Sequence, residues 1–161
     1  GGPVPIGLAS AQGRRGRRLP IAPDERTAVT DAPRPDLRPV VWGAVSGLLA
    51  VGLGAFAAHA LEGRVPADRL ATFQTGADYQ LAHALALVLT AWVGQVGRPV
   101  QARAAARFFL LGTILFSGSL YALTLTGIGW LGAITPFGGV LFLAGWLMLA
   151  VAARRPTGAP R

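Results

Sequence analysis

Two histidines carry the side chains of this 161-residue chain that are best suited to binding a metal ion or a haem iron. His59 and His83 are the only histidines, and they lie near the ends of two apolar runs. The imidazole side chain is a common ligand of both metal ions and haem iron. Cysteine is absent, and the nearest carboxylates, Glu62 and Asp78, stand at the boundaries of those runs. Because no thiolate or carboxylate is well placed to complete a site, we predict no metal ligands and identify no cofactor.

Further polar side chains recur at helical spacing within the apolar runs. Gln80 precedes His83 by three residues, and a later run presents Ser117, Tyr121 and Thr124 at spacings of four and three. Residues three or four apart share a helix face, and polar groups inside a membrane usually face the interior of a bundle. We therefore predict one polar patch, made of His59, Gln80, His83, Ser117, Tyr121, Thr124 and Thr135.

This patch has one structural and two functional interpretations. In the structural one, which we favour, its side chains hydrogen-bond between helices and hold the bundle in register, each bond contributing about 0.6 kcal/mol. The alternatives are a ligand-, haem- or metal-binding protein and a small transporter, although small transporters usually need an acidic residue deep in a span. The sequence has no nucleophile paired with a base, no phosphate-binding loop and no HExxH pattern, so we predict a non-enzymatic protein without catalytic residues.

Long apolar runs must position these residues. The chain is 52% hydrophobic and only 14% charged, whereas a soluble domain carries about 25% charged residues. A bilayer core needs about 20 helical residues to cross it, and four runs reach about that length, at 40–61, 79–97, 105–126 and 133–153. None of these runs alternates apolar and polar residues, as the strands of a transmembrane barrel do. In lipid their backbone N–H and C=O groups must therefore pair within each segment, which requires helices. We predict an all-α, membrane-spanning four-helix bundle over residues 39–155.

The arginines give the bundle an orientation. All 15 basic residues are arginine, the net charge is +8, and only Arg64 and Arg69 follow the first or third span. The others precede the first span, separate the second from the third, or follow the fourth, and the positive-inside rule makes those segments cytoplasmic. We therefore predict a multi-pass plasma-membrane protein with cytoplasmic N- and C-termini, and we place the polar patch near the extracytoplasmic end of the bundle.

The segments outside the bundle are two tails. Residues 1–38 are rich in proline and arginine and poor in apolar residues, so they cannot offset their ordering entropy and we predict a disordered tail. Residues 156–161 form a short cytoplasmic tail. Because arginines flank uncharged runs, we expect membrane lipid rather than nucleic acid as the partner, and a second copy or another membrane protein remains an open alternative. The abundance of glycine, alanine, proline and arginine is typical of a GC-rich, bacterial genome.

Two further features concern packing and the first outer loop. Small residues at four-residue spacing let helix backbones approach closely, either within one chain or between copies, and we favour contacts within the chain. The glycines that we predict in such contacts are Gly43, Gly47, Gly54, Gly118, Gly138 and Gly139. Residues 66–78 combine apolar and charged positions, so they predict a short amphipathic helix that lies on the outer surface or extends the second span.

Four stretches resemble a known family. GAFAAHAL at 54–61, YQLAHALAL at 79–87, LFSGSLY at 115–121 and ITPFGG at 134–139 are similar, in order, to the family called domain of unknown function 423. It includes UPF0382-type bacterial inner-membrane proteins and is related to eukaryotic transmembrane protein 256. The resemblance covers about 40–153 and implies a small multi-span membrane protein without an assigned activity. It also implies signature positions at His59, Gln80, His83, Ser117, Tyr121 and Pro136, and the chain departs from the family's usual residues at Ala57 and Ala82.

Overall fold

The computed structural model describes residues 1–2 and 35–154. Most of the predicted disordered tail at 1–38, and all of the predicted tail at 156–161, lie outside these residues. Every regular element in the described part is a helix, which confirms the all-α fold class. The elements are α2 (Arg38–Phe56), a π-helical turn η1 (Ala57–Leu61), α3 (Ala67–Val96), α4 (Pro99–Thr126), a 3-10 turn η2 (Gly129–Ala133) and α5 (Thr135–Ala152).

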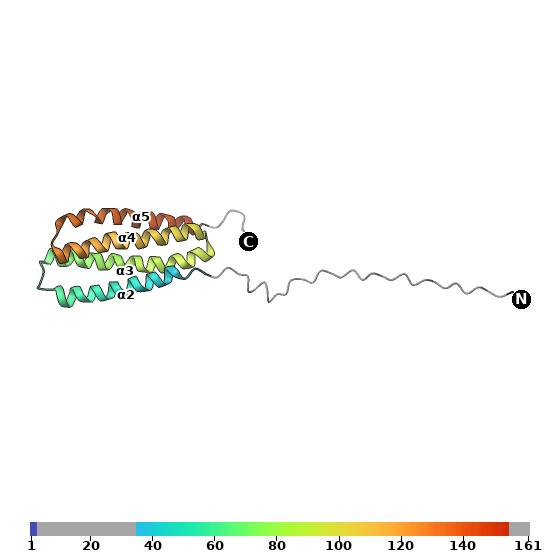
Figure 1. Cartoon of the computed structure of the whole chain (residues 1–161), viewed down its shortest axis with the longest axis horizontal. Helices are drawn as coiled ribbons and strands as arrows, with labels where there is room; N and C mark the ends of the chain where they lie inside the picture. Colours follow the sequence, from blue (N-terminus) through green and yellow to red (C-terminus); the bar gives the residue numbers. More distant parts are fainter. Residues whose placement is uncertain (3–34, 155–161) are drawn as a thin grey trace. The chain divides into compact units, whose positions relative to one another are not determined.

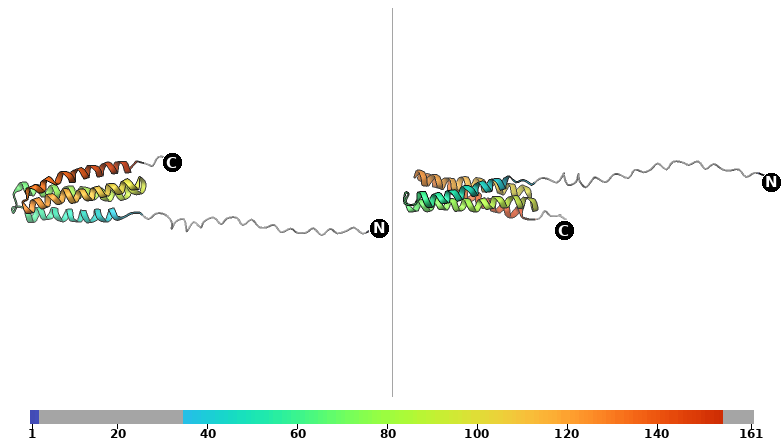
Figure 2. Two further views of the ribbon diagram at one scale, coloured as in Figure 1. Left: turned by 45° about the horizontal axis from the view of Figure 1, so that its top comes forward. Right: turned by 90° about the horizontal axis from the view of Figure 1, so that it is seen from below.

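The four long helices lie side by side and alternate in direction, so that consecutive helices are neighbours (Figures 1 and 2). Helix α3 is central, because it contacts α2 on one side, α4 on the other, and also touches α5. Helix α2 packs mainly on α3. This confirms the predicted four-helix bundle, and it makes α3 the helix that the other three share.

One end of the bundle holds the start of α2, the α3–α4 turn and the end of α5 (Figure 1). The turn has two residues, Gly97 and Arg98, and the backbone N–H of Arg98 donates to the carbonyl oxygen of Ala152 at 2.8 Å. This bond fixes the last turn of α5 against the α3–α4 turn. The longer connections, which contain η1 and η2, lie at the opposite end.

Three of the helices are long and apolar enough to cross a membrane. They are Arg38–Leu61, Pro99–Thr126 and Gly129–Ala152, with mean hydropathies of 1.9, 1.8 and 1.9. Helix α3 is not among them: charged residues occupy its first part, and Gln80, His83 and Gln95 interrupt the apolar remainder. The structure thus supplies the fourth helix that the sequence predicts, while its crossing of the membrane stays a prediction.

The segment 66–78 is the first part of α3, which runs without a break from Ala67 to Val96. It extends the second predicted span and does not form a separate surface helix. Phe73 is fully buried there against Ala57 and Leu61, and its ring centroid is 4.6 Å from that of Tyr121. The apolar positions of this segment therefore serve the bundle core.

Glycines allow the closest helix contacts. A Cβ built on Gly112 would lie 2.6 Å from Cδ1 of Phe142, and one on Gly145 would lie 2.6 Å from Cδ1 of Phe109, so the rings fill the space that these glycines leave. A Cβ on Gly138 would meet the backbone nitrogen of Phe116. These contacts join α4 to α5 around a core that includes Leu87 of α3.

The six glycines predicted in helix contacts fall into three groups. At Gly43 a Cβ would lie 2.7 Å from Cγ2 of Val88, and Gly138 is equally close to α4. Gly47 and Gly139 would make ordinary contacts at 3.8 and 4.0 Å, whereas a Cβ on Gly54 or Gly118 would meet nothing within 4 Å. Four-residue spacing therefore marks a stripe of small residues without telling which of them face a neighbouring helix.

Candidate functional site

The residues of the predicted polar patch lie in several separate contacts. Gln80 and Tyr121 meet each other, and His83, Thr124 and Thr135 each bond to a residue outside the predicted set. His59 and Ser117 take part in none of these hydrogen bonds. The arrangement is therefore a series of interhelical contacts rather than one cluster around a common centre.

Gln80 joins three helices. Its side-chain Nε2 donates to the backbone oxygen of Ser46 in α2 at 3.0 Å, and its Oε1 accepts from the hydroxyl of Tyr121 in α4 at 2.9 Å. The side chain is buried, and burial of an amide without hydrogen bonds is unfavourable. Here both the amide N–H and the amide oxygen have a partner inside the bundle. The small residues Gly43 and Gly47 keep α2 close enough to α3 for the first bond to form.

His83 joins α3 to α5. Its Nδ1 lies 2.7 Å from the carbonyl oxygen of Tyr79, which can only accept, so Nδ1 carries the proton. Its Nε2 then accepts from the indole N–H of Trp146 at 3.3 Å. The imidazole also stacks on the ring of Phe142, with centroids 3.4 Å apart and planes 9° from parallel. Both ring nitrogens are thus engaged in a neutral ring, and neither offers a lone pair to a metal without losing a hydrogen bond.

The two histidines do not share a site. His59 is exposed on the η1 turn, whose Ala57 and Leu61 pack around Phe73. Phe73 precedes His83 by ten residues of one helix, which corresponds to about 15 Å along its axis. Among residues 1–2 and 35–154 no three histidine or acidic side chains gather as they would around a metal ion. Joint ligation of one iron or metal by His59 and His83 therefore has no geometric support.

The remaining members of the patch have local roles. Thr135 and Ser119 place their hydroxyl oxygens 2.8 Å apart, which connects the start of α5 to α4. Thr124 donates from Oγ1 to the backbone oxygen of Arg69 at 3.1 Å, which ties the end of α4 to the first part of α3. Ser117 is fully buried, and its hydroxyl has no hydrogen-bond partner among residues 1–2 and 35–154.

Sequence reasoning missed four of the hydrogen-bond partners. Trp146 reads as an ordinary aromatic residue of an apolar run, and the backbone oxygens of Ser46 and Arg69 carry no signal at all. Ser119 stands two residues after Ser117 and was within reach of the same reasoning. What the sequence lacks is the rotation of each helix, which decides which polar residue faces which neighbour.

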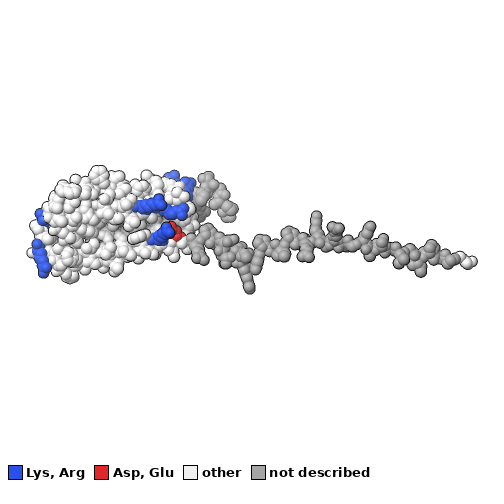
Figure 3. All heavy atoms as spheres, viewed as in Figure 1, with Lys and Arg blue, Asp and Glu red and all other residues white. Residues whose placement is uncertain are grey.

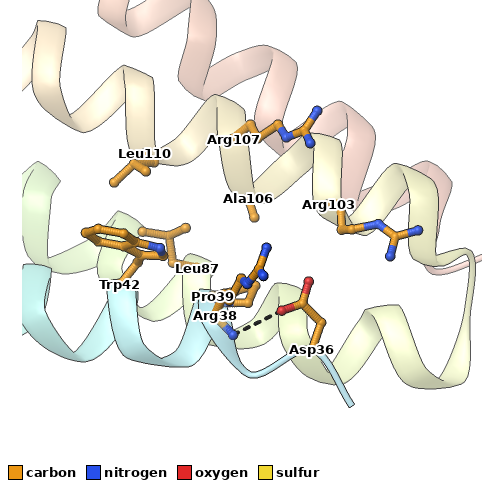
Figure 4. Close-up of a pocket in the computed structure, with 9 residues that line it drawn as sticks. All are labelled: Asp36, Arg38, Pro39, Trp42, Leu87, Arg103, Ala106, Arg107 and Leu110. Carbon is orange, nitrogen blue, oxygen red and sulfur yellow. Dashed lines mark hydrogen bonds between the residues drawn. The ribbon is translucent and has the colours of Figure 1, made fainter. Parts of the chain in front are cut away.

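A groove at the end of the bundle that holds the start of α2 was also missed. It lies between the starts of α2 and α4 over α3, and it has a volume of about 200 Å³ (Figure 4). We call it the arginine groove, after three of the residues that line it. Its lining is Asp36, Arg38, Pro39, Trp42, Leu87, Arg103, Ala106, Arg107 and Leu110. The available signal was Arg103 and Arg107 at four-residue spacing on one helix face.

Charge is confined to the two ends of the bundle on the face that Figure 3 shows. A broad uncharged band separates basic side chains at one end from those at the other, as expected for a surface covered by lipid. The acidic atoms visible on this face lie beside the basic group at the end that holds the start of α2. This is the end that holds the arginine groove (Figure 4).

Comparison with known proteins adds a family to this geometry. The model of the family described as "Protein of unknown function (DUF423)" matches residues 53–139. The UPF0382 membrane protein YwdK of Bacillus subtilis is 46% identical over 115 residues, which cover 71% of this chain and 94% of that protein. The UPF0382 inner membrane protein YgdD of Escherichia coli K12 is 41% identical over 116 residues, covering 72% of this chain and 88% of that protein. No solved structure matches the chain significantly.

Proposed function

Because the chain belongs to the DUF423 family of membrane proteins, we propose that it is a non-enzymatic helical bundle of the bacterial plasma membrane. In this proposal its four long helices all cross the bilayer, and its polar side chains serve to hold them together. The observation that carries it is the buried Gln80, which hydrogen-bonds to α2 through Ser46 and to α4 through Tyr121. A relative that is named as an inner membrane protein supports the location.

The position of α3 in the bundle supports the proposal that it crosses the bilayer. It lies between α2 and α4, both of which are long and apolar enough to span, and only two residues separate it from α4. Its polar residues Gln80 and His83 are turned to neighbouring helices, where their hydrogen bonds are satisfied. A helix whose polar groups are covered in this way can stand in lipid although its own hydropathy is lower.

We propose that both termini lie in the cytoplasm. The described arginines at the end of the bundle that holds the start of α2 and the end of α5 are Arg38, Arg98, Arg103, Arg107 and Arg154. The opposite end has Arg64 and Arg69, accompanied by three acidic residues, Glu62, Asp68 and Asp78. The positive-inside rule assigns the first group to the cytoplasm.

Cysteine labelling tests this orientation, since the chain has no native cysteine. The variants Glu62→Cys and Arg154→Cys place one thiol at each end of the bundle. In intact cells a membrane-impermeant maleimide should label the first variant at once and the second only after permeabilisation. The reverse pattern would exclude cytoplasmic termini, and labelling of both thiols in intact cells would exclude a four-span topology.

A structural role for the polar residues is tested by matched variants of one helix. Gln80→Leu removes two interhelical hydrogen bonds, whereas Gln95→Leu makes the same change where the amide bonds only within α3, to the Ala91 carbonyl oxygen. We expect the first variant to lower the free energy of unfolding by about 1 kcal/mol and the second to leave it unchanged. Equal effects would contradict the proposed role of Gln80.

A ligand-binding function would appear in a different measurement. The wild-type protein and His83→Phe are purified gently, and their visible absorbance and metal content are compared. We expect neither preparation to hold a stoichiometric haem or metal, because both nitrogens of His83 are engaged by Tyr79 and Trp146. A Soret band in the wild type that the folded variant lacks would show that His83 holds a haem, and would overturn its purely structural role.

A further inference from the structure

The arginine groove combines a basic rim with an apolar floor. Arg38 comes from the start of α2, and Arg103 and Arg107 lie one turn apart on α4 (Figure 4). The floor and the deeper wall are Leu87 of α3 and Leu110 of α4. A charged rim next to an apolar channel is the arrangement that an amphiphile requires.

The groove exists because α2 and α4 both pack on α3 while leaving a gap between themselves. A Cβ on Gly43 would lie 2.8 Å from the backbone oxygen of Ala84, so α2 approaches α3 closely just beyond the groove. On the α4 side the small side chain of Ala106 lines the gap. The opening is therefore a product of the backbone arrangement rather than of one flexible side chain.

Among the described residues that line the groove, positive charge exceeds negative charge. Asp36 is the acidic residue among the lining residues, against three arginines. Its Oδ1 accepts from the backbone N–H of Arg38 at 3.2 Å, so this carboxylate serves the start of α2 (Figure 4). Guanidinium groups bind phosphate through paired N–H donors, and those of Arg103 and Arg107 belong to exposed side chains.

The apolar part of the groove is suited to an acyl chain. Trp42 lines it and is 53% exposed, and tryptophan prefers the boundary between headgroups and acyl chains. The half-buried Leu110 continues this wall along α4, and the buried Leu87 closes the floor. An acyl chain that lies along these residues would bring its own phosphate to the level of the three arginines.

We propose that the arginine groove binds one anionic phospholipid. Arg38, Arg103 and Arg107 hold the phosphate, and an acyl chain lies along Trp42, Leu87 and Leu110. The site itself requires only that the bundle stands in a membrane. Its assignment to the cytoplasmic leaflet rests on the orientation given under Proposed function.

Charge complementarity favours a lipid over the chain's own N-terminal segment. Residues 1–34 contain six arginines against three acidic residues, so this segment is basic like the rim of the groove. Two basic surfaces repel each other, whereas a phosphate is attracted by about 1 kcal/mol for each arginine near the membrane surface. The observed charges therefore select an anionic occupant.

Lipid retention by the full-length protein tests the proposal. The protein is incubated in detergent with an equimolar mixture of phosphatidylglycerol and phosphatidylcholine, re-isolated, and the bound lipids are measured by mass spectrometry. The variant Arg103→Gln/Arg107→Gln removes two rim charges, and the control Arg64→Gln/Arg69→Gln removes two charges at the opposite end. We expect the first variant to reduce the retained ratio of phosphatidylglycerol to phosphatidylcholine about thirtyfold, at about 1 kcal/mol for each of the two arginines, and the control to leave it unchanged.

A second variant removes the groove and keeps every charge. Ala106→Trp places a large side chain in the gap between α2 and α4, and we expect it to abolish the preference for phosphatidylglycerol while circular dichroism still reports a helical protein. If that variant fails to fold, the two arginine pairs decide alone. Equal losses in the two pairs, or no loss in either, would overturn the site.

The other occupant is tested by removing residues 1–34. Retention of phosphatidylglycerol that rises in this shortened chain would show that the N-terminal segment fills the groove, and would overturn the proposal; unchanged retention supports it. Because lipid in detergent reaches both ends of the bundle, these results do not depend on sidedness. The reverse pattern in the cysteine-labelling experiment would place the lipid site in the outer leaflet without contradicting it.

Discussion

The two outer helices of the bundle, α2 and α5, are attached by different means. The same share of each apolar window, 22%, is buried in the described structure. Helix α5 interlocks with α4 through Gly112, Gly138 and Gly145, where rings or backbone fill the space of a missing side chain. Helix α2 approaches α3 closely at Gly43 and is held there by the bond from Gln80. Equal burial therefore does not mean equal interlocking.

This difference has a consequence for the surface of the molecule. Where α5 meets α4, phenylalanine rings occupy the gaps, and His83 stacks on one of them, Phe142. Where α2 faces α4, the arginine groove remains. The close-packed side is suited to stability, and the open side leaves room for a lipid.

The largest effect should come from the α4–α5 contact. In Gly138→Ala the new Cβ would meet the backbone of Phe116, with Cα only 2.8 Å away, and backbone cannot rotate out of the way as a side chain can. We expect the free energy of unfolding, measured in detergent, to fall by about 3 kcal/mol. The neighbouring Gly139→Ala, whose Cβ would stand 4.0 Å from the Phe116 ring, is the control. Equal losses of stability in Gly138→Ala and Gly139→Ala would show that the close contact of Gly138 with the Phe116 backbone does not matter.

A smaller loss is expected at the α2–α3 contact. In Gly43→Ala the Cβ would lie 2.7 Å from Cγ2 of Val88, a side-chain atom that can yield, and 2.8 Å from the oxygen of Ala84, which cannot. We expect a loss of about 2 kcal/mol, accompanied by a weaker Gln80 bond. Gly54→Ala, which meets nothing within 4 Å, should be neutral or should stabilise α2 by up to about 1 kcal/mol. If Gly43→Ala were more stable than the wild type, the close contact between α2 and α3 at Gly43 would be contradicted.

The polar link between α3 and α4 should contribute less than either glycine contact. Tyr121→Phe removes the hydroxyl that bonds to Gln80 Oε1, and Gln80→Leu removes both of the amide's bonds. A double-mutant cycle of these two changes should give a coupling energy of about 0.6 kcal/mol in the free energy of unfolding. A coupling energy of zero would show that the two side chains act independently.

The smallest effect is expected for the indole bond of α5. Trp146→Phe keeps an aromatic ring near Phe109 and His83 but removes the N–H that donates to His83 Nε2 at 3.3 Å. We expect the free energy of unfolding to fall by about 0.5 kcal/mol, because the stack of His83 on Phe142 remains. Trp92→Phe, at a tryptophan that is 61% exposed, should change nothing. A larger loss of stability in Trp92→Phe than in Trp146→Phe would contradict the stabilising role of the Trp146 hydrogen bond.

The helix boundaries show how far local sequence carries the prediction. Helix α4 begins at Pro99, six residues before the predicted span at 105–126. Proline suits a first helical turn, and the arginines that follow can lie outside the apolar core of the bilayer. The helix ends at Thr126, before Gly127 with its left-handed φ of 73°. The second helix begins at Ala67, well before its apolar run, since helix formation does not require a residue to be in lipid.

The sequence by itself determined four helices, their approximate limits and the separation of most arginines from the acidic segment at residues 62–78. These features follow from hydropathy, glycine, proline and charge, which act locally along the chain. Only the tertiary structure decided that Gln80 reaches Ser46 and Tyr121, that His83 meets Trp146, and that a groove opens between α2 and α4. The physical reason is that each helix can turn about its own axis at little cost in hydropathy, so that side-chain packing between helices, which joins residues far apart in sequence, selects the faces that meet.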